Sequence, residues 1–245
     1  MLNSAICGVS MAAEPATGAG QVLRVGVAPQ SPPMIFKEGK DLAGVEADFA
    51  QALGKELGRQ IQFVELPWEE LINALVAGKV DIIMSSMSVT RARESRVAFC
   101  DPYLRVGQMA LVRAEDRYRF ALLDGGLSKR TIGVKKGTTA DLLVQQEFPR
   151  AQRKYYKSAD DGAKALSKKQ IDLFITDSTV VSYLEGMYES KSLVKAPMIF
   201  SDEVLGWAVR RSDDSLRDSV NAYLKKVKEN GELAKILKRW IPRLQ

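Results

Sequence analysis

The stretch that decides the fold reads Asp81-Ile-Ile-Met-Ser-Ser-Met-Ser-Val-Thr-Arg-Ala-Arg-Glu-Ser-Arg-Val-Ala-Phe99. Together with Val80 it begins as an apolar run that only Asp81 interrupts, which is typical of a parallel strand buried on both faces. The run then changes to hydroxyl side chains and arginines. Because ligands of open α/β sheets bind just beyond the carboxyl ends of the strands, the stretch predicts a ligand site at the end of this strand.

The polar groups at this strand end suit an anion. They are the hydroxyls of Ser85, Ser86, Ser88 and Thr90 and the guanidinium groups of Arg91, Arg93 and Arg96. A guanidinium group binds a carboxylate well because its planar fork donates two parallel, charge-assisted hydrogen bonds. The alternative is a polar loop with solvated arginines, and this stretch alone does not decide between the two.

The composition is that of an ordinary globular protein, with 245 residues, 46% of them hydrophobic and 27% charged. This length suggests one large domain or two small ones. The net charge of +6 is basic, but the positive charge is spread along the chain, is mixed with 30 acidic residues and forms no long Lys/Arg block. We therefore expect no nucleic-acid partner.

Missing residues and motifs narrow the chemistry. The chain has no histidine, which excludes histidine-based triads, general bases and metal ligands. Its two cysteines, Cys7 and Cys100, cannot form a cysteine-rich zinc site, and the glycine motifs G-x-x-x-x-G-K-[ST] and G-x-G-x-x-G are not present. We expect no metal and no cofactor.

Residues 1–21 differ from the rest in composition. The segment up to Ala13 is uncharged, small and apolar, and a stretch rich in Pro, Gly and Ala follows. It resembles the end of a secretory signal with a cleavage site at Ser10-Met-Ala12, although the positive region that opens such signals is missing, which leaves open whether the true start lies upstream. We expect a signal remnant and export to the periplasm; the alternative is a disordered tail.

From residue 22 the chain alternates between expected strands and helices. Strands are expected at 23–28, 61–65 and 80–84, with helices at 45–58 and 68–78 between them. After a strand at 108–112 the pattern restarts, with strands at 131–135, 153–157 and 171–176 and helices at 140–148 and 158–169. This alternation predicts parallel sheets. A last strand at 204–209 precedes helices at 213–229 and 232–240, which we expect to cap a sheet; the alternative is a membrane-surface helix.

The two halves contain a repeat. Residues 74–84 align with residues 165–175 at an offset of 91 (165 minus 74), and both read as a helix end, a turn, [VI]-Asp and an apolar strand. The same offset pairs Ser86 with Asp177, so each half places a polar group at the same strand end. If the halves are similar lobes that face each other, these two ends meet across a cleft.

Motifs in order along the chain resemble the core signature of the periplasmic solute-binding proteins for amino acids, the family 3 type of ABC-importer receptors. They are Gly44-Val-Glu-Ala-Asp48, Trp68 before Leu71-Ile72, Ser85-Ser-Met-Ser-Val-Thr90 with Arg93, Phe99-Cys-Asp-Pro-Tyr103, Lys135-Lys-Gly-Thr-Thr139, Asp177, and the closing segment 231–240. The similarity covers about residues 22–243.

The resemblance implies an α/β, two-lobed periplasmic-binding-protein fold of type II, in which each lobe is a mainly parallel sheet flanked by helices. We expect a hinge of two crossing strands near Leu111–Arg113 and Ser201–Leu205. The first lobe would then be discontinuous (22–112 and 204–245), and the second would be 113–203. The ligand would bind between the lobes, which close by hinge bending.

The resemblance also assigns site residues. Arg93 would clamp the ligand's α-carboxylate, Ser86 and Ser88 would add donors, Thr139 would offer its amide and hydroxyl from the second lobe, and Asp177 would pair with the α-ammonium. The other expected site residues are Thr138, Gln30, Trp68 stacked over the ligand's apolar part, and Phe36 on the same wall. For Trp68, the alternative is a core aromatic on an amphipathic helix.

Two positions depart from receptors for cationic amino acids, which carry an acidic residue at the end of the first strand and an aromatic residue shortly after it. Here these positions are Ala28 and Ser31. The departures argue against a ligand of the lysine or arginine type. Gln30 would instead meet a polar neutral side chain.

We therefore expect an extracytoplasmic solute-binding protein, not an enzyme, that is monomeric and delivers an amino acid-like ligand to an ABC permease in the inner membrane. Three alternatives belong to other classes. They are a dehydratase-like enzyme on the same scaffold that relies on Asp177, Lys135 or Glu203, a sensing domain of a signalling or cell-wall protein, and a receptor-like protein that contacts another protein.

Overall fold

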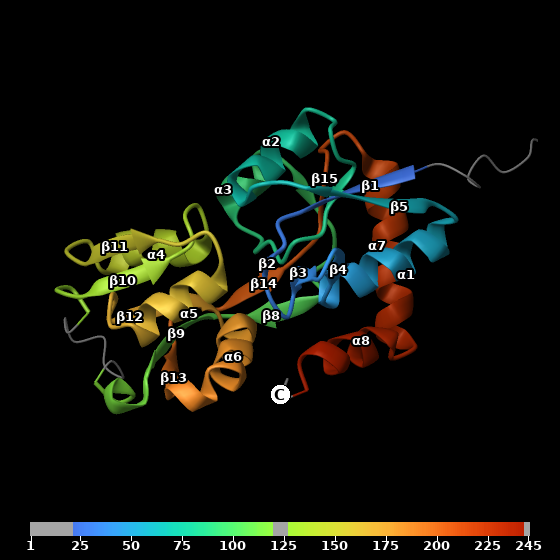
Figure 1. Cartoon of the computed structure of the whole chain (residues 1–245). Helices are drawn as coiled ribbons and strands as arrows, with labels where there is room; N and C mark the ends of the chain where they lie inside the picture. Colours follow the sequence, from blue (N-terminus) through green and yellow to red (C-terminus); the bar gives the residue numbers. More distant parts are fainter. Residues whose placement is uncertain (1–21, 120–126, 243–245) are drawn as a thin grey trace, which may run out of the picture.

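The computed structural model describes residues 22–119 and 127–242, so the expected signal segment lies outside the described residues. Figure 1 shows two lobes side by side, each built on a five-stranded sheet with helices packed against it. The first lobe contains both the beginning and the end of the described chain, and the middle of the chain forms the second lobe. The fold therefore places the two halves of the repeat in different lobes.

The first lobe has a mixed sheet. Across the sheet its strands are β5 (Gln60–Glu65), β1 (Val22–Val27), β6 (Ile82–Ile83), β15 (Ala208–Val209) and β7 (Ala98–Phe99). β1 is parallel to β5 and β6, whereas β15 is antiparallel to β6 and β7. Since β15 comes from the C-terminal part of the chain, two separate segments build this lobe.

Helices cover both faces of this sheet. They are α1 (Val45–Leu57), the 3₁₀ turn η1 (Trp68–Glu70), α2 (Leu71–Val76), α3 (Arg91–Glu94), α7 (Asp214–Glu229) and α8 (Glu232–Trp240). Helix α1 buries Val45, Phe49 and Leu53 completely, as its apolar periodicity predicts, and Gly58 ends it in the left-handed conformation with φ 62°. One apolar cluster lies under α1, α7 and α8, and a second lies under α2.

The second lobe repeats this plan. Across its sheet the strands are β11 (Gln152–Tyr155), β10 (Thr131–Val134), β12 (Leu173–Asp177), β9 (Gln108–Arg113) and β13 (Leu193–Ile199). Its helical segments are η2 (Ala114–Asp116), α4 (Thr139–Glu147), α5 (Ala159–Ser167), α6 (Ser178–Met187) and η3 (Glu189–Lys191). Only β10, β11 and β12 pair in parallel, so this sheet is also mixed rather than mainly parallel.

The internal repeat is confirmed residue by residue. In the first lobe Val25 pairs with Ile82, and in the second Ile132 pairs with Leu173, which stands 91 positions after Ile82 (173 minus 82). The aspartate of each [VI]-Asp motif has the same structural role, because its carboxylate accepts a backbone N–H of the neighbouring strand. Asp81 accepts from Arg24 at 2.9 Å, and Asp172 accepts from Thr131 at 2.8 Å.

The crossing between the lobes lies earlier in the chain than expected. Strand β8 (Leu104–Val106) pairs with β14 (Glu203–Leu205) in a two-stranded sheet. The expected crossing at Leu111–Arg113 is wrong, because these residues belong to β9 and pair with β12 and β13 inside the second lobe. Gly107 separates β8 from β9, and a Cβ atom there would stand 2.2 Å from the carbonyl oxygen of Ser201.

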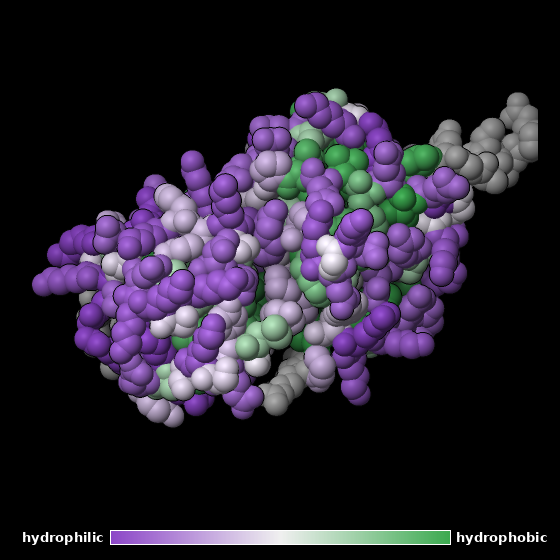
Figure 2. All heavy atoms as spheres, in the orientation of Figure 1, coloured by the Kyte–Doolittle hydropathy of each residue, from purple (hydrophilic) through white to green (hydrophobic). Residues whose placement is uncertain are grey.

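A small hairpin sheet and a largely polar surface complete the molecule. The hairpin sheet consists of β2 (Gln30–Ser31), β3 (Ile35–Glu38) and β4 (Asp41–Ala43). Figure 2 shows hydrophilic side chains over most of one face, with hydrophobic ones gathered on the first lobe. Within the described ranges, no helix is long and apolar enough to cross a membrane.

Candidate functional site

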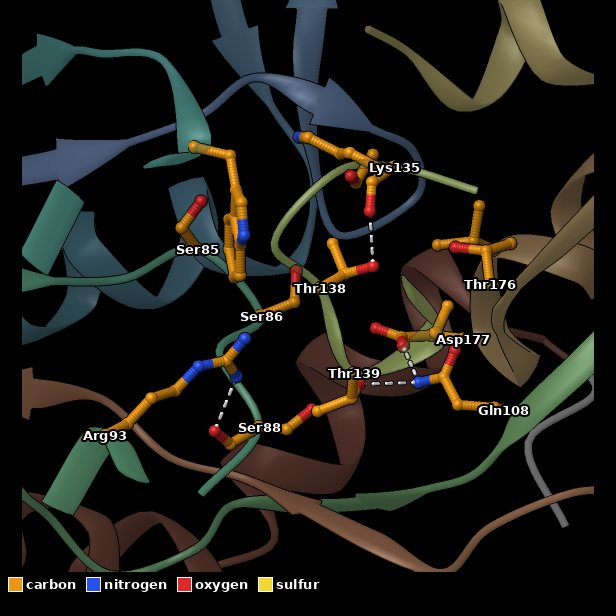
Figure 3. Close-up of a pocket in the computed structure, with 14 residues that line it drawn as sticks. Ser85, Ser86, Ser88, Arg93, Gln108, Lys135, Thr138, Thr139, Thr176 and Asp177 are labelled. Atoms are coloured by element: carbon orange, nitrogen blue, oxygen red, sulfur yellow. Dashed lines mark hydrogen bonds between the residues drawn. The ribbon is translucent and has the colours of Figure 1, made fainter. Parts of the chain in front are cut away.

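A cavity that is partly open to solvent lies between the lobes. The first lobe lines it with Ser31, Trp68, Ser85, Ser86, Ser88 and Arg93. The second lobe lines it with Gln108, Lys135, Thr138, Thr139, Ala140, Thr176, Asp177 and Val180. All the expected site residues except Gln30 and Phe36 line this cavity, and Figure 3 shows Arg93 and Asp177 on opposite sides of it.

The first-lobe wall is a loop of serines after β6, which we call the serine loop (residues 85–89). Ser86 has a left-handed backbone with φ 52°, which is uncommon for a residue with a side chain. Its buried hydroxyl has no hydrogen-bond partner among the described residues. Arg93 donates from Nη1 to the carbonyl oxygen of Ser88 at 2.7 Å, which fixes the guanidinium at the cavity (Figure 3).

The serine loop is bonded to crossing strand β14 and its neighbours. Val89 donates its backbone N–H to Val204 at 2.9 Å, and Gly206 donates to Met87 at 3.1 Å. Ser88 and Leu205 form an antiparallel bridge between these two bonds. The first-lobe wall and the crossing strand therefore form one hydrogen-bonded unit.

A buried carboxylate supports the serine loop from behind. Glu46, at the start of α1, is fully buried, and its Oε1 accepts hydrogen bonds from the Ser86 N–H at 2.5 Å and the Tyr103 hydroxyl at 2.6 Å. Its Oε2 accepts from the indole N–H of Trp207 at 2.8 Å. Burial raises the pKa of Glu46, and these three donors oppose the shift. The strained backbone of Ser86 is thus held by a group outside the cavity.

We expect Glu46→Gln to lower the free energy of unfolding by about 1–3 kcal/mol, because a donor amide group would replace an acceptor opposite buried donors. Urea unfolding measures the loss. Glu56→Gln on the same helix is the control, since Glu56 forms an exposed ion pair with Lys226 and should cost less than about 1 kcal/mol. Equal losses in the two variants would contradict a supporting role for Glu46.

The second-lobe wall is the start of α4 together with the ends of β10 and β12. Thr138 caps α4, because its hydroxyl oxygen accepts from the Asp141 N–H at 3.4 Å and its hydroxyl donates to the Lys135 carbonyl at 2.7 Å. Gln108 donates from Nε2 to Thr139 Oγ1 at 3.0 Å and to Asp177 Oδ1 at 2.6 Å (Figure 3). These bonds connect the helix start and the strand end into one polar surface.

Opposite charges face each other in the cavity. Burial raises the pKa of Asp177 to about 6, although the hydrogen bond from Gln108 and the positive charges of Arg93 and Lys135 lower it. Burial lowers the pKa of Lys135 to about 8, against the attraction of Glu69 and Asp177. Burial also lowers the pKa of Arg93, which Asp177 and Glu203 oppose. At neutral pH the cavity therefore holds two cations and at least one carboxylate.

Trp68 lies where the two lobes meet. Its indole N–H donates to the carbonyl oxygen of Gly137 in the other lobe at 3.1 Å, and Arg93 Nη2 donates to the same oxygen at 3.4 Å. The Arg93 guanidinium lies 5.3 Å and the Lys135 ammonium 5.4 Å from the centre of the indole ring. The half-exposed ring is thus part of the cavity wall rather than a core aromatic.

Two expected site residues lie elsewhere. The Phe36 ring packs against Tyr183 and Trp240, at centroid distances of 6.3 and 5.8 Å, and does not line the cavity. Gln30 lines a neighbouring groove, where its Oε1 accepts from the Lys135 ammonium at 3.2 Å across the lobes. Phe36 lies on hairpin strand β3, and the local sequence does not specify which face of this strand points toward the cavity. The side chain of Phe36 could therefore not be placed from the sequence.

Seven lining residues are missing from the expected set: Ser31, Ser85, Gln108, Lys135, Ala140, Thr176 and Val180. Lys135 directly follows strand β10, at the same kind of strand end as Ala28 in the first lobe, so the repeat offered a signal for it. Gln108 is 1% exposed and opens strand β9 opposite Asp177. A polar residue at the start of an otherwise apolar strand was its only signal.

The sequence matches a known family along nearly all of the described chain. Residues 23–243 match the family described as bacterial extracellular solute-binding proteins, family 3. The chain is 28% identical over 204 residues to the ABC transporter glutamine-binding protein GlnH of Bacillus subtilis, which covers 82% of this chain and 73% of that protein. It is 30% identical over 202 residues to membrane-bound lytic murein transglycosylase F of Desulfosudis oleivorans, covering 80% of this chain and 44% of that protein.

A solved structure gives the same result for the fold. An ancestral amino acid-binding protein, described as a precursor of cyclohexadienyl dehydratase, superposes with a TM-score of 0.83 at 32% identity. The match covers 90% of this chain and 95% of that chain. The expected two-lobed fold is confirmed.

Proposed function

Because the chain belongs to the bacterial extracellular solute-binding proteins, family 3, we propose that it captures a free amino acid between its lobes and delivers it to an ABC importer. The observation that carries the proposal is the pairing of Arg93 and Asp177, which come from different lobes and line one cavity. A guanidinium and a carboxylate across a narrow gap match the two poles of a zwitterion. Closing the lobes excludes water and strengthens both interactions.

Each pole has supporting groups. At the carboxylate pole, Ser86 and Ser88 add hydroxyl groups to the guanidinium of Arg93, and Thr139 faces them from the start of α4, where free backbone N–H groups favour an anion. At the ammonium pole, Asp177 has one oxygen bonded to Gln108, which leaves the other for the ligand. We therefore expect tight binding to need both lobes.

The ligand side chain is expected to leave the cavity between Trp68, Gln30 and Lys135. Lys135 places a positive charge beside this path, and neither Ala28 nor Ser31 supplies an acid. Glu65 and Glu69 line only the neighbouring groove, whereas Lys135 also lines the cavity. Lys135 therefore disfavours a cationic side chain and can donate a hydrogen bond to a carbonyl or carboxylate oxygen. We therefore propose an amino acid of the glutamine or glutamate type.

Replacing Lys135 with methionine should change this preference. We expect affinity for L-glutamine to fall by about tenfold and that for L-arginine to rise, because the variant removes both the donor and the repulsion. Isothermal titration calorimetry with both amino acids measures the change. Lys168→Met is the control, since Lys168 is exposed and lines neither the cavity nor the neighbouring groove. An unchanged ratio of the two affinities would contradict the proposed side-chain position.

A thermal-shift screen of residues 22–245 with the twenty common amino acids tests the function. A ligand that binds only the native state adds RT ln(1 + [L]/Kd) to its stability and raises the melting temperature. We expect the largest shift with L-glutamine or L-glutamate. If no amino acid raises the melting temperature, the proposed function is wrong.

A dehydratase-like enzyme is the second candidate, because Asp177 has a pKa of about 6 and would hold a proton in part near neutrality. Binding without turnover is the better proposal, since one oxygen of Asp177 is engaged by the Gln108 amide and the second lobe also lines the cavity with the apolar Ala140 and Val180. Product formation from a cavity-bound compound would favour the enzyme. The transglycosylase relative does not favour it, because the chain spans less than half of that protein.

Strand pairing supports a division of the chain at Gly107 rather than at residue 112. We propose that residues 22–106 and 203–242 form the first lobe and that residues 108–200 form the second. We further propose that the protein is a monomer in the periplasm and that residues 1–21 are the remnant of its export signal. Size-exclusion chromatography with light scattering tests the monomer.

A further inference from the structure

Gln108 occupies the centre of the second-lobe wall. Its side chain is 1% exposed, and strand pairing places it directly opposite Asp177. Nε2 donates one hydrogen bond to Asp177 and one to Thr139, so both amide hydrogens are used within the wall. One side chain therefore contacts both of the second-lobe groups that face the two poles of the ligand.

The direction of these bonds follows from their chemistry. An ionised carboxylate only accepts hydrogen bonds, so the amide nitrogen rather than the amide oxygen must face Asp177. The second amide hydrogen then points at Thr139 Oγ1, which becomes an acceptor. A hydroxyl that accepts from Gln108 keeps its own hydrogen to donate elsewhere. Asp177 is left as an acceptor, and Thr139 is left as a donor.

We propose that Gln108 is a specificity-determining residue that sets the donor and acceptor polarity of the second-lobe half of the site. This inference rests on the proposed function. The Thr139 hydroxyl donates to the ligand's carboxylate, and the free oxygen of Asp177 accepts from its ammonium. A zwitterion with its poles exchanged meets a donor where it needs an acceptor, so it binds in one orientation only.

The segment between the lobes fixes Gln108 in this orientation. The Gln108 N–H donates to Ser201 Oγ at 2.9 Å, and Ser201 donates in turn to Glu203 Oε1 at 2.6 Å. Gly107, just before it, approaches the Ser201 carbonyl too closely for any side chain. Rotating the amide by half a turn would bring Oε1 against the Asp177 carboxylate, and two acceptors repel each other.

The test compares three probes in wild type and Gln108→Met: L-glutamine, 4-carbamoylbutanoate, which lacks the ammonium, and 4-aminobutanamide, which lacks the carboxylate. We expect Gln108→Met to weaken L-glutamine binding by about 10- to 100-fold in calorimetry and each analogue by only about 3- to 10-fold, because each analogue keeps one of the two poles. L-Glutamine would thus lose part of the extra affinity that its two charged groups give it over the analogues. Gln145→Met, at an exposed glutamine of α4, is the matched control and should leave all three affinities unchanged.

An equal loss for all three probes would overturn the inference, because it indicates a structural role alone. If Gln108→Met does not fold, Gln108→Leu gives the same test, since leucine is also apolar and has no hydrogen to donate. Wild-type protein that binds none of the twenty amino acids would overturn the proposed function. Wild-type binding with an equal loss in the variant overturns only the role of Gln108.

Discussion

Replacing Arg93 with alanine should lower the affinity for the amino acid by about 2–5 kcal/mol, because it leaves a desolvated ligand carboxylate without its charge partner. The guanidinium is held at the cavity by the Ser88 carbonyl and lies over Trp68. Calorimetry with L-glutamine measures the loss. A ligand that lacks the α-carboxylate should bind the variant and the wild type about equally.

Two further variants test whether the loss is specific to Arg93 and whether it depends on the shape of the guanidinium as well as on its charge. Arg91→Ala is the matched control, since Arg91 opens the same short helix but is exposed and does not line the cavity. Arg93→Lys keeps the charge but loses the planar fork, so we expect an intermediate loss. Unchanged affinity in Arg93→Ala would exclude the carboxylate clamp.

Asp177→Asn should weaken ligands with an α-ammonium by about 2–5 kcal/mol and leave ligands without it almost unaffected. Asparagine keeps the shape of the side chain and can still accept from Gln108, but the ligand's ammonium then meets an amide donor in place of a carboxylate oxygen. Calorimetry with L-glutamine and 4-carbamoylbutanoate measures the two effects. Equal losses for both ligands would contradict the role of Asp177.

The wild type should also show a pH dependence that this variant lacks. In the free protein the pKa of Asp177 is about 6, and a bound ammonium favours the carboxylate, so binding releases a proton below that pH. Affinity should fall as the pH drops through 6, by up to about tenfold per pH unit, and should level off near pH 7, where Asp177 is ionised and Lys135 is still protonated. A flat profile in the wild type from pH 5 to 8 would contradict the assignment of this pKa.

Much of the fold was predictable because the chain repeats itself and its local patterns agree with its packing. Apolar periodicity predicted α1 to within a residue of its end, and Ser158 caps α5 as expected by accepting from the Asp161 N–H at 3.1 Å. The repeat placed Ser86 and Asp177 at equivalent strand ends, and both line the cavity. These features depend on residues close in sequence.

The remaining features depend on contacts between distant segments. Strand β9 follows β8 directly, and only its long-range pairing with β12 and β13 assigns it to the second lobe. Lys135 reaches the cavity because the lobes approach each other, and Phe36 turns toward Tyr183 of the other lobe for the same reason. Gln108 acquires its importance only when Asp177 lies opposite, which strand register decides.

The bonds between the serine loop and β14 have a consequence for the order in which the two lobes bind the ligand. Since these backbone bonds join the serine loop to β14, we expect the loop to keep its position in the first lobe when the lobes separate. We therefore expect an incoming amino acid to bind the first lobe first, through its carboxylate, in an open encounter complex. We expect the second lobe to close over the ligand next and to bind its ammonium through Asp177 before transport begins.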